Sequence, residues 1–242
     1  LLPVLGRLLQ EARRWARPTE PEWWWENPHP RWRPLRTEAR PAALRAVVLY
    51  PTNALVEDQI VRLRRAIRGI RAQGGPPLWF GRYTSASPGG TRLPGPRGGG
   101  GTADARVSDI AEELRQHTRE FDSFGEHAEL RDQLQDPRHD ELITRWDMIE
   151  TPPDVLVTNY SMLNVMLMRS LEQPIFEKTR EWLESDPSHA FTLVVDELHL
   201  YRGTAGTEIG MVLRNLMLRL GLEPDSPQLR IIGTSASLGN QG

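Results

Sequence analysis

The sequence predicts an α/β fold in which helices flank a parallel β-sheet. Four short apolar runs have the character of buried strands, at residues 46–50, 155–157, 193–195 and 229–232. A strand that is buried on both faces is apolar throughout, whereas a half-exposed strand alternates between apolar and polar residues. A polar turn follows each run, and helical patterns separate the runs, as the crossovers between parallel strands require.

The helical patterns are clearest after the first strand and before the last. Asn53 is a candidate N-cap for a helix whose apolar residues recur at helical spacing up to Ile70, and Gly74 is expected to end it. A second stripe begins after Gly203 and is closed by Gly221; Met211 and Met217 on this stripe are expected to pack in the core. Weaker helices are predicted at 104–121, at 175–185 and from Leu1 onwards.

Two segments lack a regular pattern and are predicted to be irregular. Residues 18–41 are rich in proline and tryptophan, and residues 81–102 form a loop rich in glycine and proline. The side chains of Trp23, Trp24 and Trp25 could stack on the bases of a single strand. The alternative, which we favour, is that they pack against their own domain or a neighbouring one.

The composition excludes several classes of protein. The net charge is −2, so no global basic field indicates nucleic acid, and the absence of cysteine excludes disulfides and thiolate metal sites. The six histidines show no metal-ligand spacing, so we expect no structural zinc. No apolar run is long enough for a membrane span and no signal-peptide pattern is present, so we expect a soluble, cytoplasmic chain with no membrane partner.

Lys178 is the only lysine in the chain, and no glycine lies near it. A phosphate-binding P-loop needs a glycine-rich turn that ends in Gly-Lys-Ser/Thr. Any nucleotide site is therefore expected to be incomplete. The chain begins with Leu1 in place of methionine, which suggests that the sequence is a piece of a longer one.

Asp196 and Glu197 directly follow the apolar run 193–195. Ligands of open α/β sheets gather at the carboxyl ends of the strands, where these two acids would emerge together. Paired carboxylates suit a magnesium nucleotide, since one can hold the hydrated metal while the other positions and deprotonates the attacking water. A hydrophobic run followed by Asp-Glu also occurs by chance in α/β proteins, so this pair alone leaves both interpretations open.

In order along the chain, the four polar turns resemble motifs of the first RecA-like domain of DEAD/DEAH-type superfamily 2 helicases. PTNALVEDQ at 51–59 resembles motif Ia, PPDVLVTNYSML at 152–163 motif Ib, DELH at 196–199 motif II, and SAS at 235–237 motif III, with serine where the family usually has threonine; GRYT at 81–84 resembles the turn between Ia and Ib. The resemblance covers about 47–240 and is strongest to large multidomain bacterial helicases, including those of phage-defence systems and their DNA-repair relatives.

The resemblance implies a domain organisation. Residues 1–16 would be the helix after a P-loop that lies upstream of Leu1, residues 17–45 an insertion, and residues 46–242 the RecA-like ATP-binding domain 1. Motifs IV to VI, in a second RecA-like domain, would lie beyond Gly242.

The resemblance also implies residue roles, with ATP and Mg²⁺ as cofactors. Asp196 would bind Mg²⁺ through water, Glu197 would orient and deprotonate the attacking water, and His199 would couple the ATP state to Ser235 and Ser237. The residues implied to contact nucleic acid are Thr52, Asn53, Arg82, Thr84, Thr158, Asn159 and Tyr160. Thr52 and Asn53 could also cap the following helix, and Thr158 and Asn159 could simply form a turn.

We therefore expect part of an ATP-dependent helicase or translocase that acts on nucleic acid, DNA in preference to RNA. Its partners would be the second RecA-like domain and the accessory domains of the parent chain, and the isolated chain would be inactive. Two alternatives stay open: a non-catalytic nucleic-acid-binding or scaffold module derived from a motor, and a P-loop ATPase of another kind. A Gly-Lys-Ser/Thr just upstream of Leu1 would favour the motor.

Overall fold

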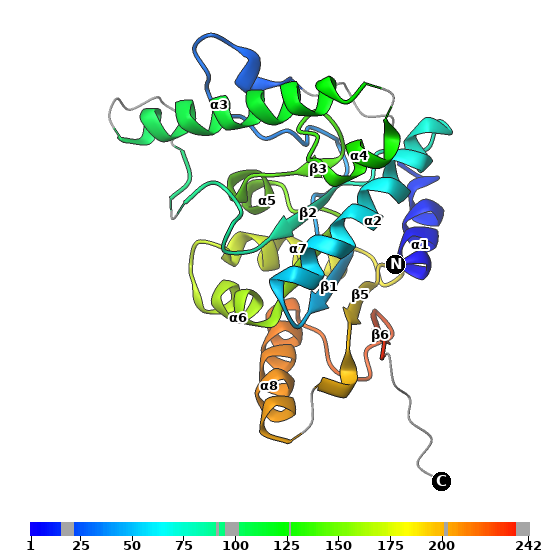
Figure 1. Ribbon diagram of the computed structural model, residues 1–242. Helices are drawn as coiled ribbons and strands as arrows, with labels where there is room; N and C mark the ends of the chain where they lie inside the picture. The colour runs from blue at the N-terminus through cyan, green and yellow to red at the C-terminus, as the bar shows by residue number, and fades with distance from the viewer. Residues whose placement is uncertain (16–21, 91, 95–101, 126, 201–202, 236–242) are drawn as a thin grey trace.

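The computed structural model describes residues 1–15, 22–90, 92–94, 102–125, 127–200 and 203–235. Within them, six strands form one parallel sheet with the order β3-β2-β4-β1-β5-β6, and helices cover both of its faces (Figure 1). The strands are β1 (Ala46–Tyr50), β2 (Phe80–Tyr83), β3 (Glu141–Leu142), β4 (Val155–Asn159), β5 (Phe191–Val195) and β6 (Leu229–Gly233). The predicted fold class is confirmed.

All four predicted strands are present, and their register brings their carboxyl ends together. The prediction that the run at 229–232 is buried was wrong, because β6 lies at the end of the sheet and its Ile231 is 59% exposed. Tyr50 at the end of β1 pairs with Asn159 of β4, while Leu49 pairs with Val195 of β5. Val195 in turn pairs with Gly233 at the end of β6. The polar turns after these strands therefore follow one edge of the sheet, as predicted; we call it the carboxyl edge.

Strands β2 and β3 were not predicted from the sequence. The prediction of an irregular loop from residue 81 and of a turn at GRYT was wrong at its start, because Phe80–Tyr83 forms β2 between β3 and β4. A four-residue strand that contains glycine has too little apolar pattern to be recognised alone. Strand β2 forms because β3 and β4 pair with it on either side, although its own residues have a weak preference for strand.

The helices divide between two cores, one on each face of the sheet. The helices are α1 (Leu2–Ala12), α2 (Asn53–Ala72), α3 (Thr102–Ser123), α4 (Ala128–Gln133), α5 (Arg145–Glu150), α6 (Tyr160–Met168), α7 (Gln173–Ser185) and α8 (Gly203–Leu220), with short 3₁₀ turns η1 (Trp24–Glu26) and η2 (Leu198–Leu200). Helices α1 and α2 pack on the face that carries Val48 and Val157, whereas α3 and α5 to α8 pack on the face that carries Val47 and Leu156. Alternate residues of a strand point to opposite faces, so each buried strand contributes to both cores.

The predicted helices agree with the observed ones to within a few residues, with two corrections. The N-cap of α2 is Thr52 and not Asn53, since the Thr52 hydroxyl accepts from the amide of Leu55 at 3.4 Å. Gly74 and Gly221 follow the ends of α2 and α8 with φ of 76° and 68°, which suits glycine. On α8, Met211 is 69% exposed, so its expected place in the core was wrong; Met217 packs against the core.

The tryptophan-rich segment packs into the larger core. Trp24 and Trp25 are buried, Trp23 is half-buried, and the 3₁₀ turn η1 that carries them lies against α3. The rings of Trp24 and Trp25 meet edge to face at 5.8 Å. The buried rings of Trp24 and Trp25 have no free face for bases, so the packing alternative describes these two residues and base stacking does not.

At the opposite, amino edge of the sheet, one carboxylate holds three arginines. Asp154 is fully buried just before β4, and it pairs with Arg36 at 3.2 Å and Arg45 at 3.0 Å and also with Arg40. Its second oxygen accepts from the amide of Trp79 at 2.9 Å. Burial alone would raise the pKa of Asp154, but the three guanidinium groups outweigh it and hold that pKa well below its usual range.

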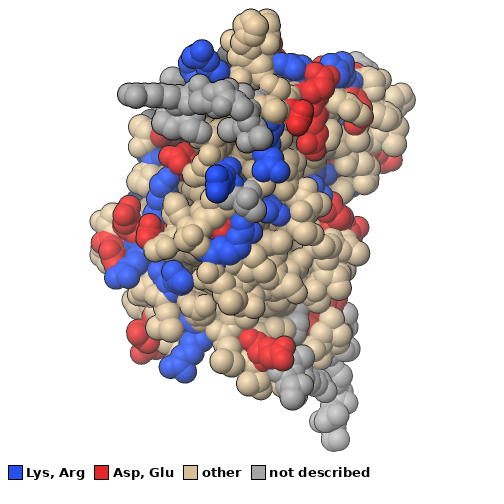
Figure 2. Space-filling view, turned by 90° about the vertical axis from the view of Figure 1, so that its left-hand side faces the viewer, with Lys and Arg blue, Asp and Glu red and all other residues tan. Residues whose placement is uncertain are grey.

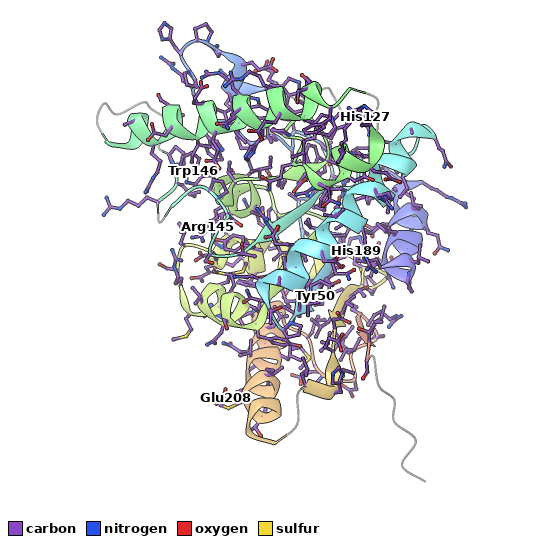
Figure 3. The ribbon with its side chains drawn as sticks, in the orientation of Figure 1. Tyr50, His127, Arg145, Trp146, His189 and Glu208 are labelled. Atoms are coloured by element: carbon purple, nitrogen blue, oxygen red, sulfur yellow. The ribbon has the colours of Figure 1, made fainter. Side chains whose placement is uncertain are left out.

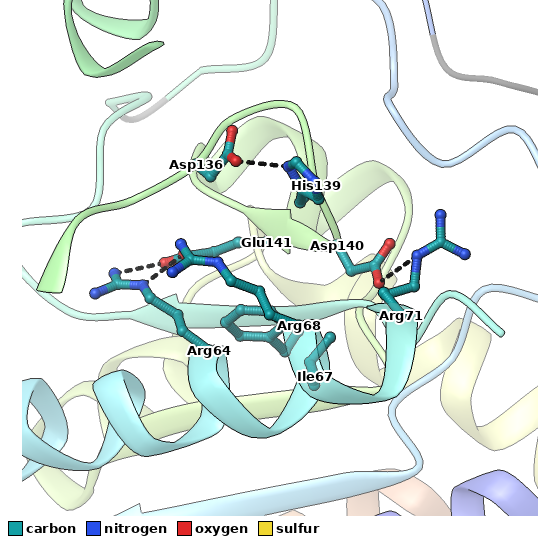
Figure 4. Close-up of a pocket in the computed structure, with 9 residues that line it drawn as sticks. Arg64, Ile67, Arg68, Arg71, Asp136, His139, Asp140 and Glu141 are labelled. Carbon is teal, nitrogen blue, oxygen red and sulfur yellow. Dashed lines mark hydrogen bonds and ion pairs between the residues drawn. The ribbon is translucent and has the colours of Figure 1, made fainter. Parts of the chain in front are cut away.

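The edge strand β3 is fixed to α2 by a row of ion pairs (Figure 4). Arg64 of α2 donates two hydrogen bonds to the carboxylate of Glu141, at 2.7 and 2.8 Å. Further along α2, Arg71 pairs at 3.5 Å with Asp140, which directly precedes β3. Between them, Arg68 pairs at 3.0 Å with Asp132, which belongs to α4. A strand of two residues makes too few backbone hydrogen bonds to stay at the edge of the sheet, so these side-chain contacts help to hold β3 there.

Among the described residues, no helix combines the length and apolar character that crossing a bilayer requires.

Candidate active site

Three backbone hydrogen bonds join the ends of β1, β5 and β6 at the carboxyl edge. The amide of Asp196 donates to Leu49 at 3.0 Å, which ties the acidic turn to β1. The amide of Thr234 donates to Val195 at 3.0 Å, and the amide of Leu198 donates to Thr234 at 2.9 Å. The turn after β5 and the turn after β6 are thus held against each other by main-chain contacts.

Glu197 has the only positive φ, 56°, among the described residues other than glycine. This left-handed conformation costs a side-chain-bearing residue of order 1–3 kcal/mol and clusters at functional sites. In a continuing strand, the side chains of Asp196 and Glu197 would point to opposite faces of the sheet. The left-handed conformation of Glu197 ends that pattern. Both acids are therefore presented at the edge, where they are partly exposed.

The side chains of the two turns form two contacts across the gap between β5 and β6. The Thr234 hydroxyl donates to Asp196. His199 Nδ1 lies 3.0 Å from Glu197 Oε2 and 3.3 Å from Ser235 Oγ, so one imidazole nitrogen touches a residue of each turn. The side chains of His199 and Glu197 are 27% and 24% exposed, so water and ligands can still reach them.

Tyr50 lies at the same edge, at the end of β1, and is labelled in Figure 3. Burial and the nearby charge of Asp196 raise the pKa of its phenol above the ordinary value. Tyr50 is therefore a neutral hydroxyl beside the acidic turn at every physiological pH. Sequence reasoning missed Tyr50 and Thr234 as site residues, although both directly adjoin turns that it singled out.

The turns after β1 and β4 form the neighbouring part of the carboxyl edge. The amide group of Asn159 donates to the side-chain oxygen of Asn53, and Asn159 Oδ1 accepts from Met162 at 2.8 Å as the N-cap of α6. Thr52 and Asn53 are exposed. The structure thus brings together three of the residues expected to contact nucleic acid.

Other residues expected in that group have structural contacts inside the chain. Thr158 is fully buried and donates to Tyr83 at 2.6 Å, and Thr84 is 1% exposed and accepts from the amide of Ala86 at 3.3 Å. Tyr160 is buried in the first turn of α6. Arg82 is mostly buried and forms an ion pair with Glu57 of α2. Ser237 lies outside the described residues.

The residues of the acidic turn fit a magnesium nucleotide. Mg²⁺ takes oxygen ligands and usually needs only one or two carboxylates from the protein, because phosphates and water complete its coordination. Asp196 and Glu197 offer such oxygens at a partly exposed edge. No cluster of three or more metal-ligating side chains occurs in the part of the chain that the structure describes.

The chain has a sequence relative among known proteins. No protein-family model matches the chain. The chain is 34% identical to Druantia protein DruE of Escherichia coli (strain UMEA 4076-1), over an alignment that covers 81% of this chain. That alignment covers 13% of DruE, so the chain spans about an eighth of the length of this relative.

Two solved structures, both described as helicases, are similar at a lower level. One is the DUF1998 helicase MrfA, with 20% identity, a TM-score of 0.41, and coverage of 81% of this chain and 20% of that one. The other is the Mycobacterium smegmatis helicase Lhr bound to ssDNA and AMP-PNP, with 20% identity, a TM-score of 0.44, and coverage of 83% of this chain and 18% of that one.

Proposed function

We propose that this chain is part of the ATP-hydrolysing domain of a nucleic-acid helicase or translocase, of the type of the first RecA-like domain of superfamily 2. The observation that carries the proposal is the contact network at the carboxyl edge, where the turns after β5 and β6 meet through Asp196, Glu197, His199 and Ser235. These are the residues that the helicase resemblance singles out, and the fold brings them together from sequence positions that lie far apart.

In this proposal Asp196 and Glu197 have different roles in ATP hydrolysis. Bound Mg²⁺ and ATP would supply a phosphoryl group made electrophilic by the metal. Asp196 would hold the metal through water, and the Thr234 hydroxyl orients its carboxylate. Glu197 would accept a proton from the attacking water, and its left-handed backbone conformation presents the carboxylate at the open edge.

His199 would transmit the state of the nucleotide to the turn after β6. Its Nδ1 touches both Glu197 and Ser235, so a change in the charge or position of Glu197 acts directly on the contact to Ser235. Ser237 is proposed to take part in the same coupling.

Nucleic acid would follow the neighbouring part of the carboxyl edge. Exposed Thr52 and Asn53 offer a hydroxyl and an amide group, which can bind phosphate oxygens without reading sequence. Arg82 could join them by exchanging its ion pair with Glu57 for a phosphate. Thr84, Thr158, Asn159 and Tyr160 would shape this surface from behind, through the buried contacts described above. DNA is the proposed substrate, and a second RecA-like domain and accessory domains are the proposed partners.

The proposal is tested by the substitution Glu197→Gln in the full-length protein. We expect ATP turnover in the presence of single-stranded DNA to fall by about 100-fold or more, since removal of a general base typically has that effect. Binding of a fluorescent ATP analogue should persist, because the amide keeps the shape of the site. Glu223→Gln, in an exposed loop before β6, is the matched control and should leave turnover unchanged. Normal turnover in Glu197→Gln would remove Glu197 from the mechanism, and a wild-type protein without DNA-stimulated turnover would favour the non-catalytic module.

A further inference from the structure

A cavity of about 510 Å³ opens at the amino edge of the sheet, away from the acidic turn. Its walls come from α1, from the segment just before β1, from α7, and from the loop that leads into β5. His189 of that loop is labelled in Figure 3, on the side of the molecule where α1 lies. Arg45 directly precedes β1 and His189 closely precedes β5, which places the cavity at the strand ends opposite to Asp196.

The cavity has an excess of positive charge. Arg7, Arg14, Arg40 and Arg45 line it, against two acids, Glu11 and Asp186. This contrasts with the face drawn in Figure 2, where basic and acidic side chains are interspersed over the described surface. The excess is also local, because the net charge of the whole chain is −2.

Two of the four arginines are already neutralised by buried partners. Arg40 and Arg45 pair with Asp154, and Arg45 also pairs with Glu11 at 2.7 Å. Aromatic rings hold the same guanidinium groups in place: Arg40 lies 3.5 Å from the ring centre of Trp15, and Arg45 lies 4.7 Å from that of Trp182. These groups form a rigid wall of the cavity.

The other two arginines have no such partner. Within the described residues, the side chains of Arg7 and Arg14 make no hydrogen bond and no close ion pair. Arg7 is partly buried, and its pKa is lowered by that burial and by the nearby charge of Arg230, which the charge of Glu11 offsets only in part. A cation that loses hydration beside a like charge is destabilised until an anion approaches. Arg7 and Arg14 are therefore the groups that a ligand would satisfy.

The spacing of Arg7 and Arg14 indicates the shape of the ligand. They lie seven residues apart, on α1 and on the turn that follows it, about 10 Å along the helix axis. Both side chains are long, so their guanidinium groups can contact neighbouring phosphate groups of one ligand. His189 borders the far wall: its Nδ1 donates to the Trp182 carbonyl oxygen at 2.6 Å, which fixes the ring beside the cavity.

We propose that this cavity binds a ligand with consecutive phosphate groups, contacted by Arg7 and Arg14 and bordered by His189. The proposal does not rest on the proposed function, since none of its residues belongs to the carboxyl edge. The phosphates could belong to a nucleic-acid backbone or to a free oligophosphate compound, and both offer the same oxygens to the arginines.

The test uses the 242-residue chain, with tripolyphosphate and a short oligodeoxythymidylate as probes in titration calorimetry. The double variant Arg7→Gln/Arg14→Gln is compared with Arg13→Gln, an exposed arginine on the same helix that does not line the cavity. We expect the double variant to bind tripolyphosphate at least tenfold more weakly and Arg13→Gln to bind it like the wild type. Circular dichroism and the unfolding midpoint verify the fold, and the single variant Arg14→Gln, at an exposed position, gives a second measurement if the double variant is unstable.

The two sources of phosphate are separated by competition. The ligand is a nucleic-acid backbone if the oligonucleotide displaces tripolyphosphate and the salt dependence of its binding is weaker in the double variant, by about 0.7 for each phosphate that is no longer neutralised. If the oligonucleotide does not compete, the ligand is a free oligophosphate compound. Equal affinity in the wild type and the double variant, or an equally weakened affinity in Arg13→Gln, would overturn the proposal.

Discussion

At the scale of single residues, two buried aspartates have opposite electrostatic situations. Asp154 is surrounded by arginines, and its pKa is held low. Asp147 in α5 has no cation beside it; burial outweighs its hydrogen bond with Thr144 and raises its pKa to about 7. The two residues therefore make opposite contributions to the dependence of stability on pH.

The first prediction concerns Asp154→Asn. This change removes the buried counter-ion that Arg36, Arg40 and Arg45 share and leaves them only Glu38 and Glu11. We expect a loss of about 3–5 kcal/mol in the free energy of unfolding at pH 7, measured by urea denaturation. Because the folded pKa lies below the unfolded value, the stabilisation from Asp154 is present above about pH 4 and is lost as the pH falls further. Asp58→Asn, in an exposed pair with Arg62, is the control and should change stability by less than about 1 kcal/mol. Similar losses in the two variants would show that the arginines do not depend on Asp154.

The second prediction concerns Asp147→Asn. The folded pKa of Asp147 is raised, so the contribution of its protonated form is complete below about pH 4 and is lost as the pH rises through about 7. The asparagine variant cannot ionise and does not lose this contribution. The unfolding midpoint of the variant should therefore rise relative to that of the wild type as the pH increases from 5 to 8. Asp109→Asn, at an exposed position on α3, should show no such trend. A constant difference between variant and wild type across this range would contradict the assignment.

At the scale of elements, the third prediction concerns Asn159, which caps a helix and lies directly behind the proposed nucleic-acid surface. Its side chain caps α6 and also contacts Asn53 at the carboxyl edge. Asn159→Ala should therefore lower stability by about 1 kcal/mol, the usual effect of losing an N-cap. Asn159→Asp keeps the capping oxygen and should restore stability, while its negative charge should weaken DNA binding, measured by fluorescence anisotropy. If both variants bind DNA like the wild type, Asn159 acts only as a cap.

The elements also show what can be predicted from a single sequence. The long amphipathic helices and the four apolar strands were predicted, because each carries its own hydrophobic period. Strands β2 and β3 were not, because Phe80–Tyr83 and Glu141–Leu142 are short and are fixed by β4 and by the arginines of α2.

For the candidate site, the position of the residues could be predicted from the sequence, but their exposure could not. Parallel strands predicted that the turns carrying Asp196 and Ser235 share one edge, and the helicase resemblance implied the grouping of these residues with Glu197 and His199. The structure brings the four residues together. The burial of Thr84 and Thr158 did not follow, because it depends on the carbonyls and side chains of neighbouring segments. A polar residue after a strand is placed at the correct edge by the sequence, but its exposure is decided by tertiary packing.

At the scale of the whole molecule, the fourth prediction is that the 242-residue chain alone does not hydrolyse ATP. Its only lysine, Lys178, lies on α7 and donates to the carbonyl oxygen of Glu150, so no lysine of this chain can serve a phosphate-binding loop. We expect no phosphate release above background with or without single-stranded DNA, measured by a coupled phosphate assay. DNA-stimulated release that Glu197→Gln abolishes would show that the chain carries a complete catalytic site.

The register of the central strand has a consequence for how the chain reaches its native state. Ala46 in β1 pairs with Val155 and Thr192, which lie more than a hundred residues later in the chain. Contacts between such distant positions form slowly, because closing a long loop costs entropy before any pairing compensates for it. Until then the apolar run of β1 lacks its neighbours and can associate with other molecules. Refolding from denaturant is therefore expected to be slow and to succeed best in dilute solution.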